Sequence, residues 1–293
     1  PYDMQWASGL FLLAPLVLVP LALPLAATVI DPRVSPRVWI VLRWTQFPVA
    51  VFLTMSFLMP TGIWAGALSV PWLMVTGLVA VIGVIDFHNA THRPWERLSC
   101  QAAMIFVPIG GVAAVMSRSG LTVFGFSDII ILATAVNFHY TGFVLLVLAG
   151  LLILQRPGMA TRISIMYVIV GIPLLATGIT LSRFNYHYPE WLAALGLSAA
   201  LIVMALGQCR LAVRQFSGVL RSLLLFSSLS LITGMCMAIL FATGVFRGMH
   251  LFGIDIPWML RYHAVINAFG FALCGLIAWH AIEHRRADEM CRS

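Results

Sequence analysis

The chain has 293 residues, of which 61% are hydrophobic and 9% are charged, and its formal net charge at pH 7 is +7. This composition excludes a water-soluble globular domain of the same length. All 17 basic residues are arginines scattered along the chain, which argues against a nucleic-acid-binding patch, and the absence of lysine excludes an opsin-type Schiff base. The composition instead predicts an integral membrane protein.

Apolar stretches of about 20 residues, each long enough to cross a bilayer, recur along the whole chain. They predict an all-α fold, a polytopic transmembrane helical bundle of about nine spans, with eight as the alternative number. We expect one integral membrane helical domain over residues 1–293. In chain order, the expected spans are Ala7–Ile30, Val38–Met59, Trp64–Ile85, Ser99–Met116, Asp128–Leu154, Thr161–Leu181, Pro189–Gln208, Val219–Phe246 and Pro257–Ile282.

The arginines divide unevenly between the two ends of these spans. Four lie on one side, namely Arg118, Arg183, Arg247 and Arg261. The other thirteen are Arg33, Arg37, Arg43, Arg93, Arg97, Arg156, Arg162, Arg210, Arg214, Arg221, Arg285, Arg286 and Arg292. Because basic residues concentrate in cytoplasmic connections, this division predicts a cytoplasmic C-terminus and an N-terminus outside.

A few strongly polar residues interrupt two of the expected spans. The fifth span carries Asn137, His139 and Tyr140, and the ninth carries His263 and Asn267, which are four residues apart and share one helical face. Polar side chains at membrane depth are costly and usually face a protein interior, a cavity or a ligand. The expected topology brings both groups to the outer half of the bilayer, so we expect the His139 and His263 side chains within about 10 Å of each other.

Polar segments at the same end of the bundle complete the candidate site. Histidine, tyrosine and carboxylate groups can move protons, arginine can stabilise developing negative charge, and amides can orient a substrate oxygen. The expected catalytic residues are His139, His263, Tyr140, Glu190 and Arg183. The expected substrate-binding residues are Asn137, Asn267, His187 and Tyr186. In the structural alternative, Asn137 and Tyr140 only form hydrogen bonds to a neighbouring helix.

A second polar cluster lies in the segment IDFHNATHRPWE, between the third and fourth expected spans. His88 and His92 have the i, i+4 spacing with which two imidazoles of one helix bind a metal, and Asp86 could add an oxygen ligand. Pro94 ends any such helix soon afterwards. We therefore keep a metal site at Asp86, His88 and His92 as an alternative and favour no metal.

Three segments resemble the corresponding segments of YndJ-like bacterial membrane proteins. They are LFLLAPLVLVPLAL near the N-terminus, TAVNFHYTGF around His139 and RYHAVINAFGF around His263. The last segment is similar to a family pattern of His-Gly-x-x-Asn-Ala-x-Gly-Phe, with Ala264 in place of the first glycine. The resemblance implies a bacterial inner-membrane protein in which the His139 and His263 segments belong together, and it implies no particular activity.

Three classes of function remain open. The favoured one is an intramembrane enzyme that carries out acid-base chemistry, such as isomerisation, cyclisation or hydrolysis of an epoxide, on a lipophilic small molecule surrounded by membrane lipid. The second is a transporter or channel, for which a midplane site with broken helices is typical. The third is a redox protein in which His139 and His263 bind haem or copper. We favour the enzyme without a cofactor, because the polar groups concentrate toward one end of the spans.

Overall fold

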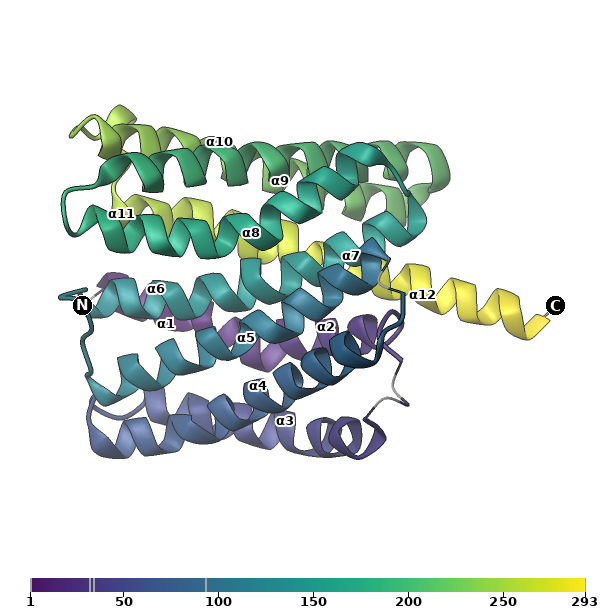
Figure 1. Cartoon of the computed structure of the whole chain (residues 1–293), viewed down its shortest axis with the longest axis horizontal. Helices are drawn as coiled ribbons and strands as arrows, with labels where there is room; N and C mark the ends of the chain where they lie inside the picture. Colours follow the sequence, from purple (N-terminus) through teal and green to yellow (C-terminus); the bar gives the residue numbers. More distant parts are fainter. Residues whose placement is uncertain (1, 32, 34, 93, 293) are drawn as a thin grey trace. The chain divides into compact units, whose positions relative to one another are not determined.

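The computed structural model describes residues 2–31, 33, 35–92 and 94–292 of the chain (Figure 1). In this part of the chain every regular element is helical, and nine helices are long and apolar enough to cross a membrane. The expected transmembrane helical bundle is therefore confirmed. Arg93 and the side chain of Arg292, both counted in the arginine division, lie outside the described residues.

The nine helices agree closely with the spans expected from hydropathy. Each helix end lies within four residues of the expected one, except that the seventh helix continues seven residues past Gln208 to Gln215. The helices are Asp3–Ala26, Pro36–Phe57, Ile63–Asn89, Trp95–Ser119, Asp128–Gln155, Met159–Ser182, His187–Gln215, Gly218–Phe246 and Ile256–Arg286.

Three of the nine membrane-spanning helices are composite, and six are single α-helices. The first consists of α1 (Tyr2–Leu13), η1 (Ala14–Leu18) and α2 (Val19–Ala26), and the fifth of α6 (Asp128–His139), η3 (Tyr140–Leu145) and α7 (Leu146–Gln155). The ninth follows the short turn η4 (Leu251–Gly253) and consists of α11 (Ile256–Trp258), η5 (Met259–His263), η6 (Ile266–Leu273) and α12 (Cys274–Arg292). The single helices are α3 (Pro36–Phe57), α4 (Ile63–Asn89), α5 (Trp95–Ser119), α8 (Met159–Ser182), α9 (His187–Gln215) and α10 (Gly218–Phe246).

The composite helices are those that contain π-helical turns. In the described residues, η1, η3, η5 and η6 are π-helical, and each overlaps one of the three segments that resemble the YndJ-like pattern. A π-turn inserts one residue into an α-helix and frees backbone groups, so such turns are rare and often occur at functional sites. The first, fifth and ninth spans are therefore the first places to look for a site.

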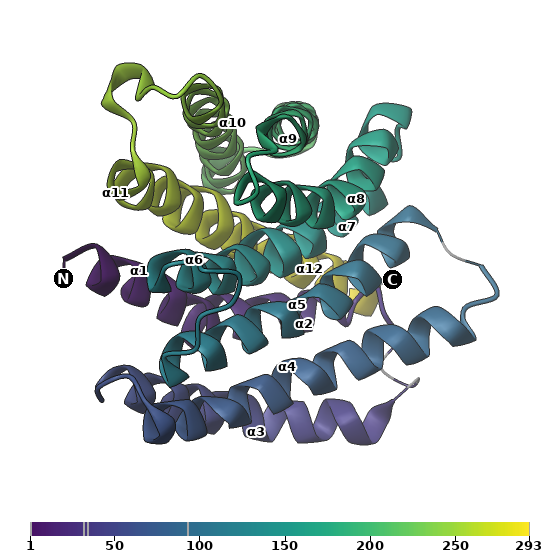
Figure 2. The ribbon, with the colours of Figure 1, turned by 60° about the vertical axis from the view of Figure 1, so that its left-hand side comes forward.

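The chain divides into two compact units, Pro1–Gly150 and Leu151–Ser293, and the division falls inside α7. In the first unit, α4 and α5 lie side by side and antiparallel in both ribbon views (Figures 1 and 2). Glycines allow this close approach, since a Cβ on Gly83 would lie only 2.8 Å from Met104 Cβ, and one on Gly111 would overlap Thr76 Oγ1. The α4–α5 hairpin is the packed centre of this unit, with α3 on α4 and α6 on α5.

Arg118 fixes one end of the first unit. It is buried in the last turn of α5 and donates hydrogen bonds to the carbonyl oxygens of Ser56 and Met59 at 2.7 to 3.1 Å. Its guanidinium also lies 4.7 Å from the ring centre of Phe57. The carbonyl groups at the end of α3 lack helical partners, so this arginine satisfies them and stabilises the helix end.

In the second unit, α8 packs on α9, α9 on α10, and α10 on the π-helical part of the ninth span. A polar layer ties the last three together inside the unit. Gln208 donates to the hydroxyl oxygens of Ser227 and Ser228 at 3.1 and 3.0 Å, and Ser227 donates to Phe271 O at 3.0 Å. These side chains are buried and mutually satisfied, as polar residues between membrane helices usually are.

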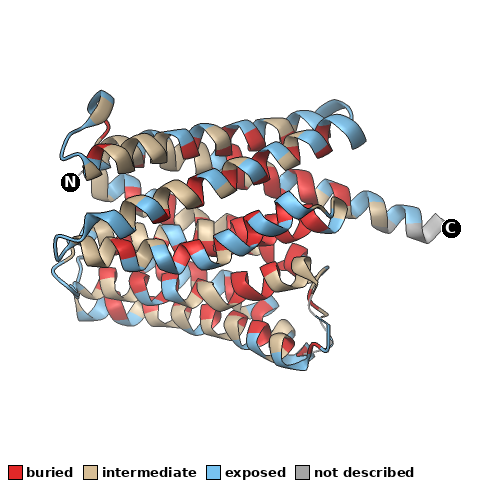
Figure 3. Ribbon diagram, turned by 45° about the horizontal axis from the view of Figure 1, so that its top comes forward, coloured by how far each residue is buried: buried red, intermediate tan, exposed pale blue. Residues whose placement is uncertain are grey.

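The outward faces of the helices are apolar along much of their length. Figure 3 shows exposed residues along the helices as well as at their ends. Many of these residues are large and apolar, among them Trp44, Leu58, Trp64 and Met159. An apolar exposed face is expected where the solvent is lipid, so the burial pattern agrees with an integral membrane protein.

Candidate active site

His139 is completely buried in the first unit, and both of its ring nitrogens are occupied. Its Nδ1 lies 2.8 Å from Ala135 O, and Trp72 Nε1 donates to its Nε2 at 3.0 Å. A carbonyl oxygen can only accept, so Nδ1 carries the proton and the Nε2 lone pair receives the Trp72 N–H. His139 has no ring nitrogen left for a substrate, a haem iron or a copper ion while the Trp72 bond exists.

Aromatic and backbone groups enclose the His139 ring on its other sides. The ring stacks on Trp72 with centres 5.9 Å apart and meets the edge of Phe11 at 5.3 Å. Gly110 lies against it so closely that a Cβ there would be 2.5 Å from Nδ1. A polar group that is buried with all its hydrogen bonds made is a structural element, and this describes His139 as the structure has it.

The other polar residues of the fifth span point away from a common centre. Tyr140 donates its hydroxyl proton to Leu10 O at 2.7 Å, which joins the fifth span to the first. Asn137 is exposed, and its Oδ1 accepts a 3.2 Å hydrogen bond from Thr141. The helix-to-helix hydrogen bond of the structural alternative is therefore present for Tyr140, and Asn137 does not lie beside His139.

His263 lies in the second unit and has one ring nitrogen without a comparable partner. Its Nδ1 is 2.8 Å from Gly234 O, so Nδ1 carries the proton and the neutral ring has its lone pair at Nε2. Among the described residues, the one hydrogen-bonding group within 3.5 Å of Nε2 is the amide nitrogen of Asn267, which lies 3.5 Å from both ring nitrogens. A donor equally far from both nitrogens is not aligned with either in-plane lone pair, so the Nε2 acceptor is available.

Asn267 presents a second available acceptor next to His263. Its Nδ2 donates to His263 O at 2.8 Å, and a carbonyl acceptor fixes which end of the amide is the nitrogen. Its Oδ1 is buried and finds no hydrogen-bond donor among the described residues. A buried carbonyl oxygen without a donor is costly, so this atom and His263 Nε2 together suit a ligand that carries hydroxyl or N–H groups.

The π-helical turns and Gly234 explain why these two side chains reach their positions. η5 ends at His263 and η6 begins at Ile266, so the polar pair sits where the ninth span is wound most widely. Gly234 on α10 leaves room for the Asn267 amide, since a Cβ at this glycine would lie 2.7 Å from Oδ1. In the second unit, η5, η6 and α12 all contact α10.

His263 lies beside Gly234 of α10 in the second unit. Gly234 is 16 residues after the first residue of α10 and 12 before its last, which is near the middle of a membrane-spanning helix. His263 and Asn267 are both half-buried, and their neighbours Tyr262 and Phe269 are 52% and 47% exposed. The ninth span therefore presents large exposed side chains next to the half-buried pair in the sequence.

The connection between α8 and α9 lies at a different level of the second unit. Trp191 beside Glu190 donates to Thr243 Oγ1 at 3.3 Å, and Thr243 is nine residues from Gly234, or about 13 Å along α10. The backbone of Glu190 packs on Gly178 of α8. Arg183 and Tyr186 in this connection and His187 at the start of α9 are exposed. These four expected site residues therefore do not form one layer with His263.

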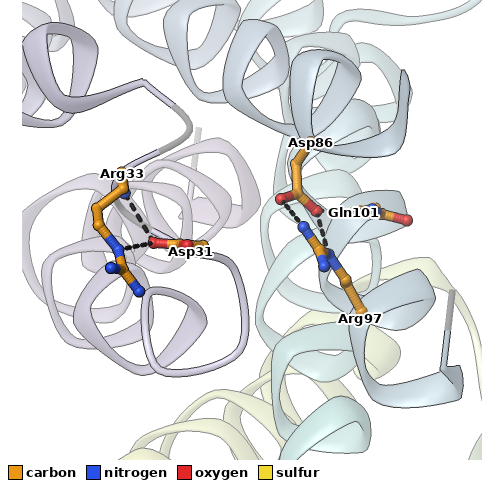
Figure 4. A network of polar contacts seen from close by, with 5 residues as sticks. All are labelled: Asp31, Arg33, Asp86, Arg97 and Gln101. Carbon is orange, nitrogen blue, oxygen red and sulfur yellow. Dashed lines mark hydrogen bonds and ion pairs between the residues drawn. The ribbon is translucent and has the colours of Figure 1, made fainter. Parts of the chain in front are cut away.

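The structure also separates the residues of the alternative metal site. α4 ends at Asn89, so His88 and His92 are not on one helix, and both are exposed. Asp86 is inside α4 and completely buried, where Arg97 Nε and Nη2 donate to its two oxygens at 2.8 and 2.6 Å (Figure 4). In the described part of the chain, no group of three His, Cys, Asp or Glu side chains is arranged to hold a metal ion.

Gln101 completes the Asp86 cluster and was not expected from the sequence. Its Nε2 donates to Asp86 Oδ2 at 2.7 Å (Figure 4), so the carboxylate accepts three hydrogen bonds from α5. Arg97 and Gln101 are one helical turn apart, and this spacing is the signal that could have identified them as partners of Asp86. The cluster joins α4 to α5 and is a structural ion pair of the first unit.

The close packing of Gly234 makes the geometry around His263 testable. In Gly234→Ala the new methyl group overlaps the Asn267 amide, so Asn267 has to leave His263. We expect a lower unfolding temperature in detergent and a changed NMR signal of the His263 ring. Gly77→Ala on α4, where a Cβ meets no atom within 4 Å, is the matched control and should change neither. An unchanged His263 signal in Gly234→Ala would contradict the contact.

Comparison with known proteins agrees with the segments singled out in the sequence. The family model described as "YndJ-like protein" matches residues 9–271, which include η1, η3, η5 and most of η6. The chain is 28% identical over 299 residues to the "Uncharacterized membrane protein YndJ" of Bacillus subtilis (strain 168), an alignment that covers 98% of this chain and 50% of that protein. The chain thus spans about half the length of this relative. No solved structure matches it. The chain is an integral membrane protein that belongs to the YndJ-like family.

Proposed function

We propose that the chain is an intramembrane enzyme that carries out acid-base chemistry on a lipophilic small molecule, with His263 as the general base. One observation supports the proposal most strongly. Of the two histidines expected at the site, His139 has both ring nitrogens occupied, whereas His263 keeps its Nε2 lone pair available. A base needs such a lone pair within hydrogen-bond reach of the proton that it removes.

The groups around His263 suit this role. The bond from Nδ1 to Gly234 O fixes the ring in one tautomer and orients Nε2, and the carbonyl dipole stabilises the imidazolium that forms when Nε2 takes a proton. Asn267 Oδ1 would accept a hydrogen bond from a substrate hydroxyl and so hold the substrate beside the base. Isomerisation, cyclisation and hydrolysis of an epoxide all need such a proton transfer.

The proposal assigns the chemistry to His263 and Asn267 and leaves the other expected site residues outside it. Tyr140 and His139 have structural hydrogen bonds, and Glu190 lies on a different level of the second unit. The expected meeting of His139 and His263 stays a prediction, because the two histidines belong to different units. The proposed mechanism uses no metal and no haem.

We propose that the protein lies in a bacterial inner membrane with its N-terminus outside and its C-terminus in the cytoplasm. The uneven division of the 17 arginines between the two ends of the spans supports this orientation, and the Bacillus relative supports a bacterial membrane. Reporter fusions at the C-terminus test it. A fusion to alkaline phosphatase, which is active only outside the cytoplasm, should be inactive, and an active one would reverse the proposed orientation.

Conversion of membrane lipids in isotopically labelled water tests the enzymatic proposal. Purified protein is incubated with a lipophilic extract of its source membranes in normal water, in D2O and in H2 18O, and the extracts are compared by liquid chromatography and mass spectrometry. Hydrolysis adds 18O, isomerisation through carbon adds deuterium, and cyclisation changes retention at constant mass. We expect the active protein to produce one such change. If the extract is unchanged in all three waters, no acid-base conversion occurs and the proposal is wrong.

A further inference from the structure

Three arginines gather on one face at the end of α9, in the second unit. Arg156, in the connection between α7 and α8, donates from Nη1 to Gly207 O of α9 at 2.9 Å. Arg210 and Arg214 follow Gly207 by three and seven residues, which is the spacing of neighbours on one helical face. The hydrogen bond from the Arg156 side chain to the Gly207 carbonyl therefore holds its guanidinium on the face of α9 that carries the other two arginines.

These three positive charges have no carboxylate partner among the described residues. Between Asp128 and Asp255 the sequence contains a single acidic residue, Glu190, and it lies in the first turn of α9, about 30 Å along the helix from Arg210. Partial burial, together with the positive charges of Arg210 and Arg214, lowers the pKa of Arg156. The helix dipole puts about half a negative charge at the C-terminus of α9, which offsets part of this repulsion but cannot balance three positive charges.

The same face of α9 is apolar and exposed where it continues into the membrane. Val203 and Leu206 are two turns and one turn before Arg210 and are 42% and 54% exposed, and Val213 between the two arginines is 50% exposed. The face thus combines an apolar track with a group of guanidinium ions at its end. Such a face is complementary to a phospholipid, whose acyl chains can lie along the helix while its phosphate reaches the membrane interface.

We propose that Arg156, Arg210 and Arg214 bind the phosphate headgroup of an anionic phospholipid whose acyl chains lie on Val203 and Leu206. Guanidinium groups bind phosphate oxygens through paired, charge-assisted hydrogen bonds, and an anion removes the repulsion between the three arginines. A zwitterionic lipid carries a positive group that they repel. The inference is independent of the proposed enzymatic function, because it uses no residue near His263.

Thermal unfolding of the purified full chain in detergent, with added lipid, tests this site. Phosphatidylglycerol and phosphatidylcholine with identical acyl chains are compared for the unaltered protein, for Arg210→Gln/Arg214→Gln and for Arg247→Gln. Arg247 is an exposed arginine at the other end of α10 and serves as the matched control. Inorganic phosphate is added in a separate series to distinguish a free anion from a lipid headgroup.

We expect phosphatidylglycerol to raise the unfolding temperature of the unaltered protein and of Arg247→Gln more than phosphatidylcholine does. In the double variant this difference should disappear, and each single substitution should weaken phosphatidylglycerol binding about fivefold. If the double variant does not fold, the two single variants give the result. The proposal would be overturned if the two lipids had equal effects on the unaltered protein, or if the preference for phosphatidylglycerol survived in Arg210→Gln/Arg214→Gln. It would also be overturned if Arg247→Gln lost this preference to the same extent, or if inorganic phosphate stabilised the protein as much as phosphatidylglycerol.

Discussion

His263→Asn is expected to abolish the conversion of the lipophilic substrate while the protein stays folded. The shorter amide side chain can still donate a hydrogen bond toward Gly234 O, but it has no imidazole nitrogen to act as a base. Loss of a general base slows a reaction by about 10² to 10⁴-fold. The measurement is the rate of product formation from the membrane extract, with the unfolding temperature in detergent recorded beside it.

The parallel substitution at His139 is the control for this prediction. His139→Asn removes the acceptor of the Trp72 N–H inside a fully buried site, so its main expected effect is a loss of stability of about 1 to 3 kcal/mol. The folded fraction should keep its activity. An active His263→Asn, or an inactive but fully stable His139→Asn, would contradict the roles that the hydrogen bonds of the two histidines indicate.

The second large effect is expected from Asp86→Ala, which should destabilise the protein by about 3 kcal/mol. Asp86 is completely buried, and its removal leaves Arg97, whose side chain is only 25% exposed, without its counter-ion. Gln101 also loses its acceptor. The free energy of unfolding, measured by denaturant titration in detergent micelles, should therefore fall strongly.

Two further variants show whether the Asp86 effect comes from burial of an unpaired charge. Asp86→Leu/Arg97→Leu removes both charges and should recover much of the lost stability, because an apolar pair carries no desolvation cost. Asp31→Ala breaks the pair of Asp31 with Arg33, which is exposed, and should leave the unfolding transition unchanged. This explanation would be refuted if Asp31→Ala and Asp86→Ala lowered the free energy of unfolding equally, or if Asp86→Leu/Arg97→Leu recovered none of the lost stability.

Much of the fold follows from the sequence because one constraint dominates it. A membrane-spanning segment has to satisfy its own backbone hydrogen bonds, so length and hydropathy together determine where helices occur. The expected spans agree with the nine helices of the described chain for this reason. Asp86 shows the limit of the argument. A charged residue ends an apolar stretch by composition, yet α4 continues past it to Asn89, where Arg97 compensates the charge of Asp86 and Gln101 donates a further hydrogen bond to it.

The candidate site was less predictable, because hydropathy indicates how deep a residue lies in the membrane but not in which direction its side chain points. His139 and His263 have similar sequence surroundings, and only the hydrogen bonds distinguish an occupied ring from an available one. Whether Trp72 would face His139 depends on the packing of α4 against the fifth span. Likewise, the place of Gly234 beside Asn267 depends on how α10 meets the π-helical turns. Contacts between segments that are distant in the chain produce no periodic pattern in the sequence from which they could be predicted.

The expected site residues around the start of α9 do not lie level with His263 for a related reason. Arg183, Tyr186, His187 and Glu190 lie at the expected end of the helices, but residue counting along single spans cannot show how two spans are shifted against each other. The hydrogen bond of Trp191 to Thr243 places the start of α9 about 13 Å along α10 from Gly234. A sequence pattern can therefore identify polar residues on the same side of a membrane without identifying those that act together.

A density map of the protein purified in lipid discs from its source membrane, at a resolution that shows side chains, tests the role of His263 most directly. The proposal predicts an elongated non-protein density whose polar end lies about 3 Å from His263 Nε2, with Asn267 Oδ1 facing the same group. In a map of His263→Ala this density should be weak or absent. A His263 Nε2 that accepts a hydrogen bond from a protein donor, or that coordinates a metal ion, would contradict an acid-base site at this histidine.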